Sequence, residues 1–362
     1  MVKMAKESAS SIPGTVAIPP HPSVRWRVYI LAGLVLVLLI TAATATAFGT
    51  VKVPFLTVIN VLLSKIPLIG IQADYPATLG TIIIDIRLPR VILAGLVGAS
   101  LALAGGAYQG LFRNPLADPY LIGVAQGASL GAVAGFMLPV SIMGPALIPL
   151  LAFCGALLST VIVYSLARVG KTLPVSTLIL AGVALSALLG SAVSYLIIAS
   201  GDKLHGIIFW LMGSFSLSNW PEVRILLPYI LAGTVVILVY SRPLNIMQLD
   251  EEQAHQLGVD VERLKLILLA ASTMIVAASV AFAGTIGFVG IIIPHAVRLI
   301  WGPDYRFLLP FSVVTGAVFM ILADLAARTL LAPTEIPIGV ITALCGAPFF
   351  LYLLRSRRRV IF

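Results

Sequence analysis

The feature that most constrains this chain is a series of long apolar runs from which charge is almost excluded. Of its 362 residues, 60% are hydrophobic and only 10% are charged, and the mean hydropathy is +1.09. Such values exclude an ordinary soluble domain. A helix needs about 20 apolar residues to cross a bilayer, so this length accommodates about ten crossings with short loops. We therefore predict an all-α, polytopic membrane protein.

The apolar runs define the expected organisation of the chain. The predicted spans lie at roughly 28–48, 89–111, 119–138, 145–167, 175–199, 224–242, 262–282, 286–301, 307–325 and 337–354. The connections 50–85 and 202–220 are expected to hold interfacial helices, because the first is semi-apolar and Trp210 and Trp220 suit the membrane surface. Residues 1–27 are predicted to form a disordered cytoplasmic tail, 28–355 the ten-helix transmembrane domain, and 356–362 a basic cytoplasmic tail.

The lysines and arginines predict the orientation of the chain. With the N-terminus inside, 16 basic residues face the cytoplasm and 7 face outward, which together make the 23 in the sequence. The positive-inside rule then places both termini in the cytoplasm. The cytoplasmic set is Lys3, Lys6, Arg25, Arg27, Arg113, Arg168, Lys171, Arg242, Arg263, Lys265, Arg298, Arg306, Arg355, Arg357, Arg358 and Arg359. The outer set is Lys52, Lys65, Arg87, Arg90, Lys203, Arg224 and Arg328.

One polar stretch, residues 248–265, interrupts the apolar pattern on the predicted cytoplasmic side. It holds five of the fourteen acidic residues. Leu249, Ala254, Leu257 and Val261 recur at roughly helical spacing, which predicts two short amphipathic helices broken near Gly258, over about 248–261. The stretch is too short and too charged to cross a bilayer. Its apolar stripe would lie in a groove of this protein or of a partner; the alternative is a solvated loop.

Two predicted spans carry small residues at every fourth position. Small faces allow helix backbones to approach closely, and a hydroxyl-bearing face also suits a water-filled path. Close packing explains both ladders, and the second is also a tentative pathway lining through Ser186, Gly190 and Ser194. The ladders are Gly123, Gly127, Gly131 and Gly135, and Gly182, Ser186, Gly190 and Ser194.

No stretch predicts catalysis, a metal site or a nucleotide site. Gly170-Lys171-Thr172 imitates the end of a phosphate-binding loop, but Ser165 stands where that motif needs a glycine. The four histidines have no ligand spacing, and Cys154 and Cys345 lie inside apolar runs. Because the basic residues are spread over loop ends, they indicate topology and not nucleic acid. We predict that the chain is not an enzyme and holds no cofactor, and that any ATP is bound by another chain.

The acidic residues bear on the transport mechanism. An ion-coupled carrier usually keeps a carboxylate near the middle of the bilayer. In this chain the acids near the spans fall at or near their ends, which favours a pathway opened by an outside source of power. An ion-coupled secondary transporter of a similar substrate is the alternative. The acids concerned are Asp85, Asp118, Asp304, Asp324 and Glu335.

Several specific motifs, in order and at matching spacing over about residues 28–355, resemble one family. The chain resembles the permease subunits of ABC importers for ferric siderophores, heme and cobalamin. The motifs are Ile86-Arg-Leu-Pro-Arg90, Gln109-Gly-Leu-Phe-Arg-Asn-Pro-Leu-Ala-Asp-Pro119, Leu180-Ala-Gly-Val-Ala184, Phe209-Trp-Leu-Met-Gly213, Ala281-Phe-Ala-Gly-Thr-Ile-Gly-Phe-Val-Gly-Ile-Ile-Ile-Pro-His-Ala-Val-Arg298, Leu322-Ala-Asp-Leu-Ala-Ala-Arg328, Glu335-Ile-Pro-Ile-Gly-Val-Ile-Thr-Ala343 and Gly346-Ala-Pro-Phe349.

The resemblance implies ten helices per subunit, a homodimer with its pathway on the dimer axis, and a place in the cell inner membrane. It also implies two ATP-binding subunits, which would hold ATP and Mg, and one periplasmic or lipid-anchored substrate-binding protein. The substrate would be a metal chelate: a ferric siderophore, which is the most widespread in the family, heme or cobalamin.

The resemblance also assigns roles to particular positions. Residues 248–261 match the coupling helices that sit in a groove of the ATPase, and two outer motifs match arginines that dock on glutamates of the binding protein. The loop Leu173-Pro-Val-Ser-Thr177, before the fifth predicted helix, matches a cytoplasmic gate, although Pro174 and Val175 depart from the hydroxyl-rich cobalamin version. The coupling residues are Glu252, Ala254, Leu257 and Gly258; the docking residues are Arg87, Arg90 and Arg328; the gate residues are Val175 and Ser176.

Overall fold

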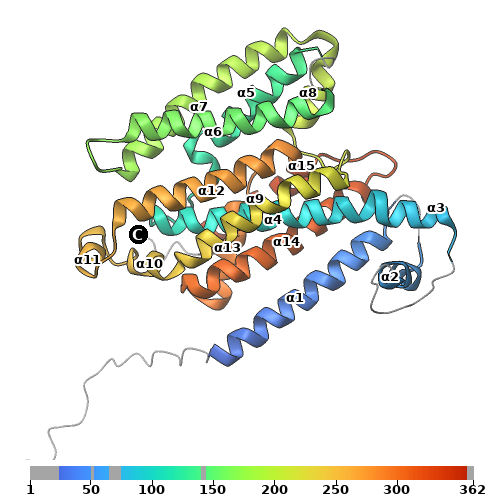
Figure 1. Cartoon of the computed structure of the whole chain (residues 1–362), viewed down its shortest axis with the longest axis horizontal. Coiled ribbons are helices and arrows are strands. Elements are labelled where there is room, and N and C mark those ends of the chain that lie inside the picture. Colours follow the sequence, from blue (N-terminus) through green and yellow to red (C-terminus); the bar gives the residue numbers. More distant parts are fainter. Residues whose placement is uncertain (1–23, 50–52, 65–74, 140–143, 357–362) are drawn as a thin grey trace, which may run out of the picture.

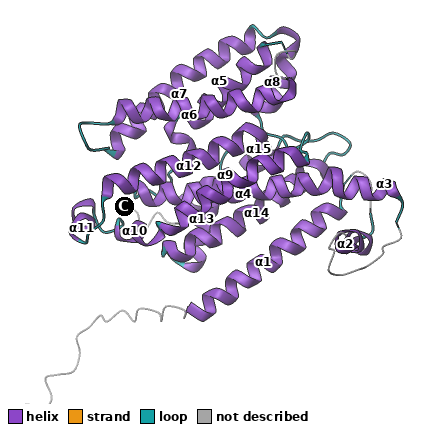
Figure 2. Ribbon diagram, in the orientation of Figure 1, coloured by secondary structure: helices purple, strands orange, loops and turns teal. Residues whose placement is uncertain are grey.

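The computed structural model describes residues 24–49, 53–64, 75–139 and 144–356. Within these ranges the regular structure is helical, apart from a single bridge between Val169 and Thr172 (Figure 2). The predicted all-α fold is confirmed. The tails 1–23 and 357–362 lie outside the described residues, as do seven of the residues used for the orientation. These seven are Lys3, Lys6, Lys52, Lys65, Arg357, Arg358 and Arg359.

Seven described helices are long and apolar enough to cross a membrane. They contain α1 (Val24–Ala47), α4 (Leu88–Leu111), α6 (Leu147–Ala167), α7 (Val175–Ile198), α9 (Trp220–Val239), α12 (Val261–Ala283) and α14 (Tyr305–Thr329). The shorter helices are α2 (Phe55–Ser64), α5 (Val124–Met137), α8 (Leu204–Leu211), α10 (Ser241–Ile246), α11 (Glu251–Gln256), α13 (Val289–Trp301) and α15 (Ile338–Ser356). The turn α3 (Ala77–Gly80) and the π-helix η1 (Thr81–Arg87) continue directly into α4.

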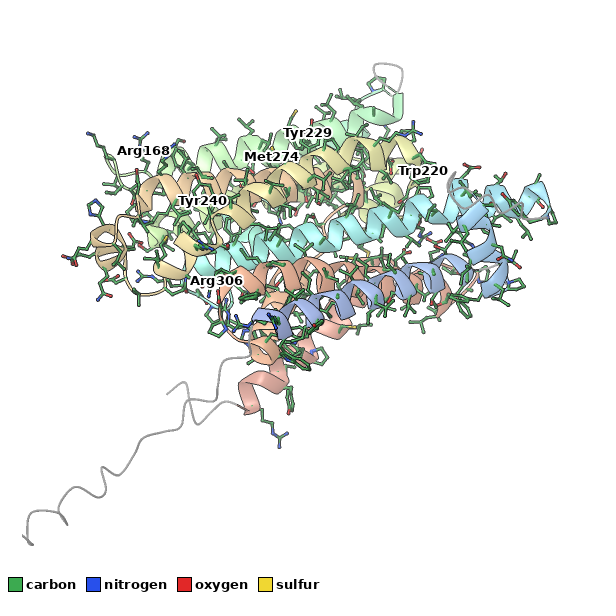
Figure 3. The ribbon with its side chains drawn as sticks, turned by 60° about the horizontal axis from the view of Figure 1, so that its bottom comes forward. Arg168, Trp220, Tyr229, Tyr240, Met274 and Arg306 are labelled. Atoms are coloured by element: carbon green, nitrogen blue, oxygen red, sulfur yellow. The ribbon has the colours of Figure 1, made fainter. Side chains whose placement is uncertain are left out.

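The helices form a bundle around α4. In Figure 1, α5, α6, α7 and α8 lie on one side of the central helices, while α1 runs obliquely along the opposite side near α14. The most apolar window of the helix ending in α4 is 83% buried, against 11% for α1 and for α7. Figure 3 places Arg168, Tyr240 and Arg306 at one end of the bundle and Trp220 toward the other. Following the orientation predicted from the sequence, we call the first the inner end and the second the outer end.

Small residues allow the central helices to touch through their backbones. A Cβ added at Gly98 of α4 would lie 2.2 Å from the carbonyl oxygen of Gly316 in α14. A Cβ at Gly127 of α5 would lie 2.4 Å from the carbonyl oxygen of Gly155 in α6, and one at Gly131 would lie 2.0 Å from that of Leu151. Close packing of the first glycine ladder is therefore confirmed, as expected for helices in lipid.

Two predicted spans begin later than the sequence indicated, because irregular segments precede their helices. Span 119–138 starts with the 3₁₀ turn η2 (Pro119–Ile122), and α5 follows only after Gly123, whose φ is +84°. Span 286–301 becomes helical only at Val289. A Cβ at Gly290 would lie 2.7 Å from Cδ of Pro119 and 3.0 Å from the carbonyl oxygen of Leu101 in α4. Both segments thus meet beside the middle of α4, where irregular backbone must be buried in protein or line a cavity.

The connections and the tail differ in detail from the predictions. Within 50–85 the structure describes α2, and within 202–220 it describes α8, so each region holds a short helix. The predicted disordered tail is wrong over its last four residues, because α1 begins at Val24. Arg27 anchors this first turn, since its Nη1 lies 3.3 Å from Oδ2 of Asp304, the N-cap residue of α14.

Candidate functional site

The charged stretch at the inner end folds as a short helix between two turns. Asp250 caps α11, accepting a hydrogen bond from the backbone N–H of Glu251 at 2.7 Å. The break at Gly258 is present, with a φ of +86°, a left-handed value that favours glycine. The predicted second short helix is absent from the described residues: after the break, Val261 begins the 23-residue helix α12. The N-cap of that helix is Asp260, which accepts from the N–H of Arg263.

The four residues of the predicted apolar stripe do not share one face: two are buried and two are exposed. Ala254 is fully buried and Val261 is 7% exposed, so both pack inside the chain. Leu249 and Leu257 are 59% and 61% exposed. Six helical residues are too few to carry all four positions on one face, because Leu249 and Leu257 lie outside α11. Among the predicted coupling residues, Glu252, Leu257 and Gly258 are therefore exposed, and Ala254 anchors the helix to the bundle.

The predicted gate loop lies beside this element. The turn that precedes it is closed by backbone hydrogen bonds in both directions between Val169 and Thr172, at 3.0 and 3.1 Å. Because α7 begins at Val175, both predicted gate residues lie in the first turn of that helix. Val175 is partly buried and Ser176 is exposed. Gly170-Lys171-Thr172 thus lies in a tight turn between α6 and the gate loop.

A pocket of about 490 Å³ lies between α5, α7 and the two irregular segments; we call it the polar pocket because six of its ten lining residues have polar side chains. Its lining includes Ser186, one of the three tentative pathway residues. A Cβ added at Gly190 would lie 3.7 Å from Oε1 of Gln126 in the same pocket. Ser194 lies outside the lining, and its hydroxyl donates to the carbonyl oxygen of Gly190 at 2.9 Å. The polar residues of the lining are Asp118, Tyr120, Gln126, Ser129, Ser186 and Thr285.

Internal hydrogen bonds position the irregular segments around this pocket. The carboxylate of Asp118 accepts from the backbone N–H of Tyr120 at 2.8 Å and caps η2. The Tyr120 hydroxyl donates to the carbonyl oxygen of Ile286 at 3.1 Å and lies 3.2 Å from the N–H of the same residue. Pocket residues Thr285 and Gly287 also line a second, mainly apolar hollow of about 620 Å³ against α8 and α15.

Sequence reasoning missed most of this pocket. We placed Asp118 at the end of a span, but the structure puts its carboxylate in the pocket beside Ser186 and Thr285. The run Asp118-Pro119-Tyr120 held a usable signal, because an acid that caps a turn inside an apolar region marks a break in the helix. The other lining residues, on α5 and in the 284–288 segment, carry no such signal without the tertiary contacts.

The three outer arginines, which we predicted to dock on a binding protein, also make bonds within the chain. The docking role itself stays a prediction from the family resemblance. Arg87 is 6% exposed, and its Nη1 donates to the carbonyl oxygens of Thr46 and Ala47 at 3.0 and 2.8 Å. Arg328, also 6% exposed, donates to the carbonyl oxygen of Ala45. These carbonyls end α1, where a helix dipole favours cations.

Arg90 completes the same cluster. Its Nη2 lies 2.9 Å from Oδ1 of the buried Asp324, and its Nη1 lies 2.9 Å from Oε1 of Glu335. Burial alone would raise the pKa of Glu335, but hydrogen bonds from Arg90 and Ser216 hold that pKa below its usual value. The partners are separated by more than two hundred positions in the chain, so the sequence did not reveal the pairing.

Comparison with known proteins identifies the family. The model of the FecCD transport family matches residues 34–356. The chain is 49% identical over 290 residues to the cobalamin import system permease protein BtuC of Halobacterium salinarum, covering 79% of this chain and 77% of that protein. It is 39% identical over 336 residues to the hemin transport system permease protein HmuU of Yersinia pestis, covering 91% and 96%.

A solved structure has the same fold. It is described as an inward-facing conformation of a metal-chelate type ABC transporter, and it matches with a TM-score of 0.79 and 35% identity over 91% of this chain and 99% of its own. The charged inner element, the irregular segments around a polar pocket and the bundle of membrane-length helices thus occur in a chain that belongs to the FecCD transport family.

Proposed function

We propose that this chain is the permease subunit of an ABC importer that moves a metal chelate across the cytoplasmic membrane. The chain is a multi-pass membrane protein and a transport component, not an enzyme. The observation that carries the proposal is the polar pocket, built from broken helices at the depth of the middle of α4. Such a lining offers hydroxyl and amide groups to a large polar chelate while lipid is kept away.

The chelate class follows from the relatives. Their names specify cobalamin, hemin and ferric citrate. The identity to the cobalamin permease is 49% and that to the hemin permease is 39%, so cobalamin is the first chelate to assay. The pocket lining, which holds hydroxyl, amide and apolar groups with one carboxylate, offers hydrogen-bonding groups that any of these chelates could use.

Power would come from two ATP-binding subunits seated on the inner end. The exposed side chains of Glu252, in the first turn of α11, and Leu257, at its end, offer one acidic and one apolar contact. A partner groove that receives Leu257 would bury its exposed surface, at about 25 cal/mol per Å². At the outer end we propose docking of a substrate-binding protein, which would meet the exposed rim around the arginine cluster and not the buried guanidinium groups themselves.

A second copy of the chain would complete the pathway. The side chains of Tyr195 on α7 and of Leu344 and Leu351 on α15 are between 66% and 72% exposed. Leu344 and Leu351 also line the apolar hollow between α8 and α15. A two-fold axis beside α7 would bring Val175 and Ser176 of both copies to a common inner gate. Membrane lipid would cover the remaining apolar surface, including most of α1.

Transport into liposomes tests the proposal. We expect cobalamin, hemin or ferric citrate to accumulate only when the ATP-binding subunits, the binding protein and ATP are all supplied. Accumulation driven by a proton or sodium gradient without the ATP-binding subunits would refute the proposal and favour an ion-coupled carrier.

A variant of the coupling helix sharpens this test. Leu257→Asp should lower the affinity for the ATP-binding subunits by about tenfold, because a carboxylate must be desolvated in an apolar groove. Leu331→Asp is the control, since Leu331 is 63% exposed at the outer end. Equal affinities for the two variants would contradict the assignment of Leu257 to the ATPase contact.

A further inference from the structure

A buried lysine joins the coupling helix to the gate loop. Lys265 lies in the first turns of α12 and is only 2% exposed. Its Nζ is 2.8 Å from Oε2 of Glu251 in α11, 3.0 Å from Oε1 of Glu262, and 3.2 Å from the carbonyl oxygen of Leu173 in the gate loop. An ammonium has three N–H donors and no acceptor, so these three contacts use its whole capacity.

The gate loop is held through Leu173, whose backbone N–H and carbonyl oxygen are both hydrogen-bonded to side chains of α12. The N–H of Leu173 donates to Oε2 of Glu262 at 2.8 Å, while its carbonyl oxygen accepts from Lys265. Glu262 therefore uses one oxygen for the lysine and the other for the loop. Leu173 is itself 5% exposed, and α7 begins two positions later at Val175.

This geometry makes α11, the start of α12 and the gate loop one connected unit. A buried ammonium that loses an acceptor is left with an unsatisfied charge, which is strongly unfavourable. A displacement of α11 that carries Glu251 with it therefore pulls on Lys265, and the lysine is bonded directly to the loop. The second tether of α11, from Arg113 to Asp250 at 2.9 Å, is solvent-exposed and does not touch the gate loop.

We propose that Lys265 is a positioning residue that transmits movement of α11 to the loop before α7, and that its bond to Glu251 links the lysine to α11. This inference rests on the proposed function, because it needs an ATPase that moves α11. A lysine that only stabilised the fold would affect stability while leaving the amount of substrate moved per ATP unchanged. The transport yield per ATP therefore separates transmission from stabilisation.

The experiment uses the complete importer in liposomes and measures cobalamin moved per ATP hydrolysed. Glu251→Ala detaches the coupling helix from the lysine and leaves Glu262 and Leu173 in place. We expect ATP hydrolysis to persist while transport per ATP falls by about fivefold or more, the usual size of a coupling effect. Glu251→Gln, which keeps an acceptor oxygen, should recover part of the loss. Lys265→Met should lose at least as much as Glu251→Ala.

Arg263→Met is the matched control, because Arg263 is an exposed cation two positions before the lysine on the same helix. The gate is followed separately by cross-linking Ser176→Cys between copies, after Cys154 and Cys345, both exposed, have been replaced. In the parent chain the cross-link should change with nucleotide, and in Glu251→Ala that change should disappear.

The outcomes are distinct. Unchanged transport per ATP and an unchanged nucleotide response in Glu251→Ala would overturn the proposal, even if Lys265→Met fails to fold. A parent importer whose Ser176→Cys cross-link does not respond to nucleotide would refute the gate assignment and, with it, the transmission role. Transport by the parent that needs no ATP would instead refute the proposed function. A loss in Arg263→Met equal to that in Glu251→Ala would mean that the effect is general charge removal, which also overturns the proposal.

Discussion

Replacing Arg90 by Met should destabilise the chain itself, whether or not any partner is present. Arg90 bonds Asp324 through its Nε at 3.0 and 3.2 Å, and it bonds both oxygens of Glu335 at 2.9 and 3.1 Å. The carboxylate of Asp324 is 1% exposed. Arg90→Met leaves that buried charge with a weaker partner, because Arg328 Nε lies 3.4 Å away.

The magnitude follows from the burial of the pair. Removing one member of a buried ion pair costs about 3–5 kcal/mol, because the other charge stays buried without compensation. Arg328 still neutralises part of the Asp324 charge, so we expect about 3 kcal/mol, at the lower end of that range. Glu335 is 33% exposed and can be rehydrated, so its lost pair adds about 1 kcal/mol or less.

Unfolding by dodecyl sulfate in mixed micelles, followed by tryptophan fluorescence, measures this loss. Arg224→Met is the control, since Arg224 is exposed at the same end on α9. The double variant Arg90→Met with Asp324→Asn should be more stable than Arg90→Met alone, because no charge is then stranded. If Arg90→Met unfolds like Arg224→Met, the cluster does not hold the outer end together, and the arginine is free to serve an external partner instead.

Two further predictions concern packing and the pathway. Gly98→Val should prevent accumulation of folded chain in membranes, because a Cβ at this position would lie 2.2 Å from the backbone of α14. Gly33→Val is the control and should be tolerated, because a Cβ at Gly33 would meet nothing within 4 Å. Equal yields of the two variants would contradict the close contact of α4 and α14. In a chain without its natural cysteines, Ser186→Cys should react with a water-soluble thiol reagent much faster than Val161→Cys on the exposed face of α6, and bound chelate should slow the reaction. Equal rates would exclude Ser186 from a water-filled path.

The short-range features of the fold were predictable because each is written in a contiguous stretch. Apolar runs of membrane length located the helices to within a few residues, except where a turn interrupts them. Gly258 marked its own break, since a left-handed residue needs no distant partner. The fourth-residue glycines of α5 predicted close packing, and the structure places the α6 backbone against two of them.

The candidate site was predictable only in part, because its residues depend on partners far away in the chain. The apolar spacing around Gly258 suggested one continuous stripe, but packing buries Ala254 and leaves Leu257 exposed. Asp118 looked like a residue at a span end until the 3₁₀ turn carried it into the pocket beside Ser186. The contacts of the outer arginines inside the chain were not visible for the same reason.

The sequence by itself determined that this chain crosses a membrane as a set of helices with its densest charge at one end, because exclusion of charge from lipid acts on every stretch separately. Only the tertiary structure decided which charges meet. Arg90 pairs with Asp324, which lies 234 positions away in the chain, and the buried ammonium of Lys265 donates to the backbone carbonyl oxygen of Leu173, 92 positions away. Pairing of buried charge is set by the three-dimensional packing of helices, since the cost of leaving an ion unpaired in a low-dielectric interior depends on what stands next to it in space.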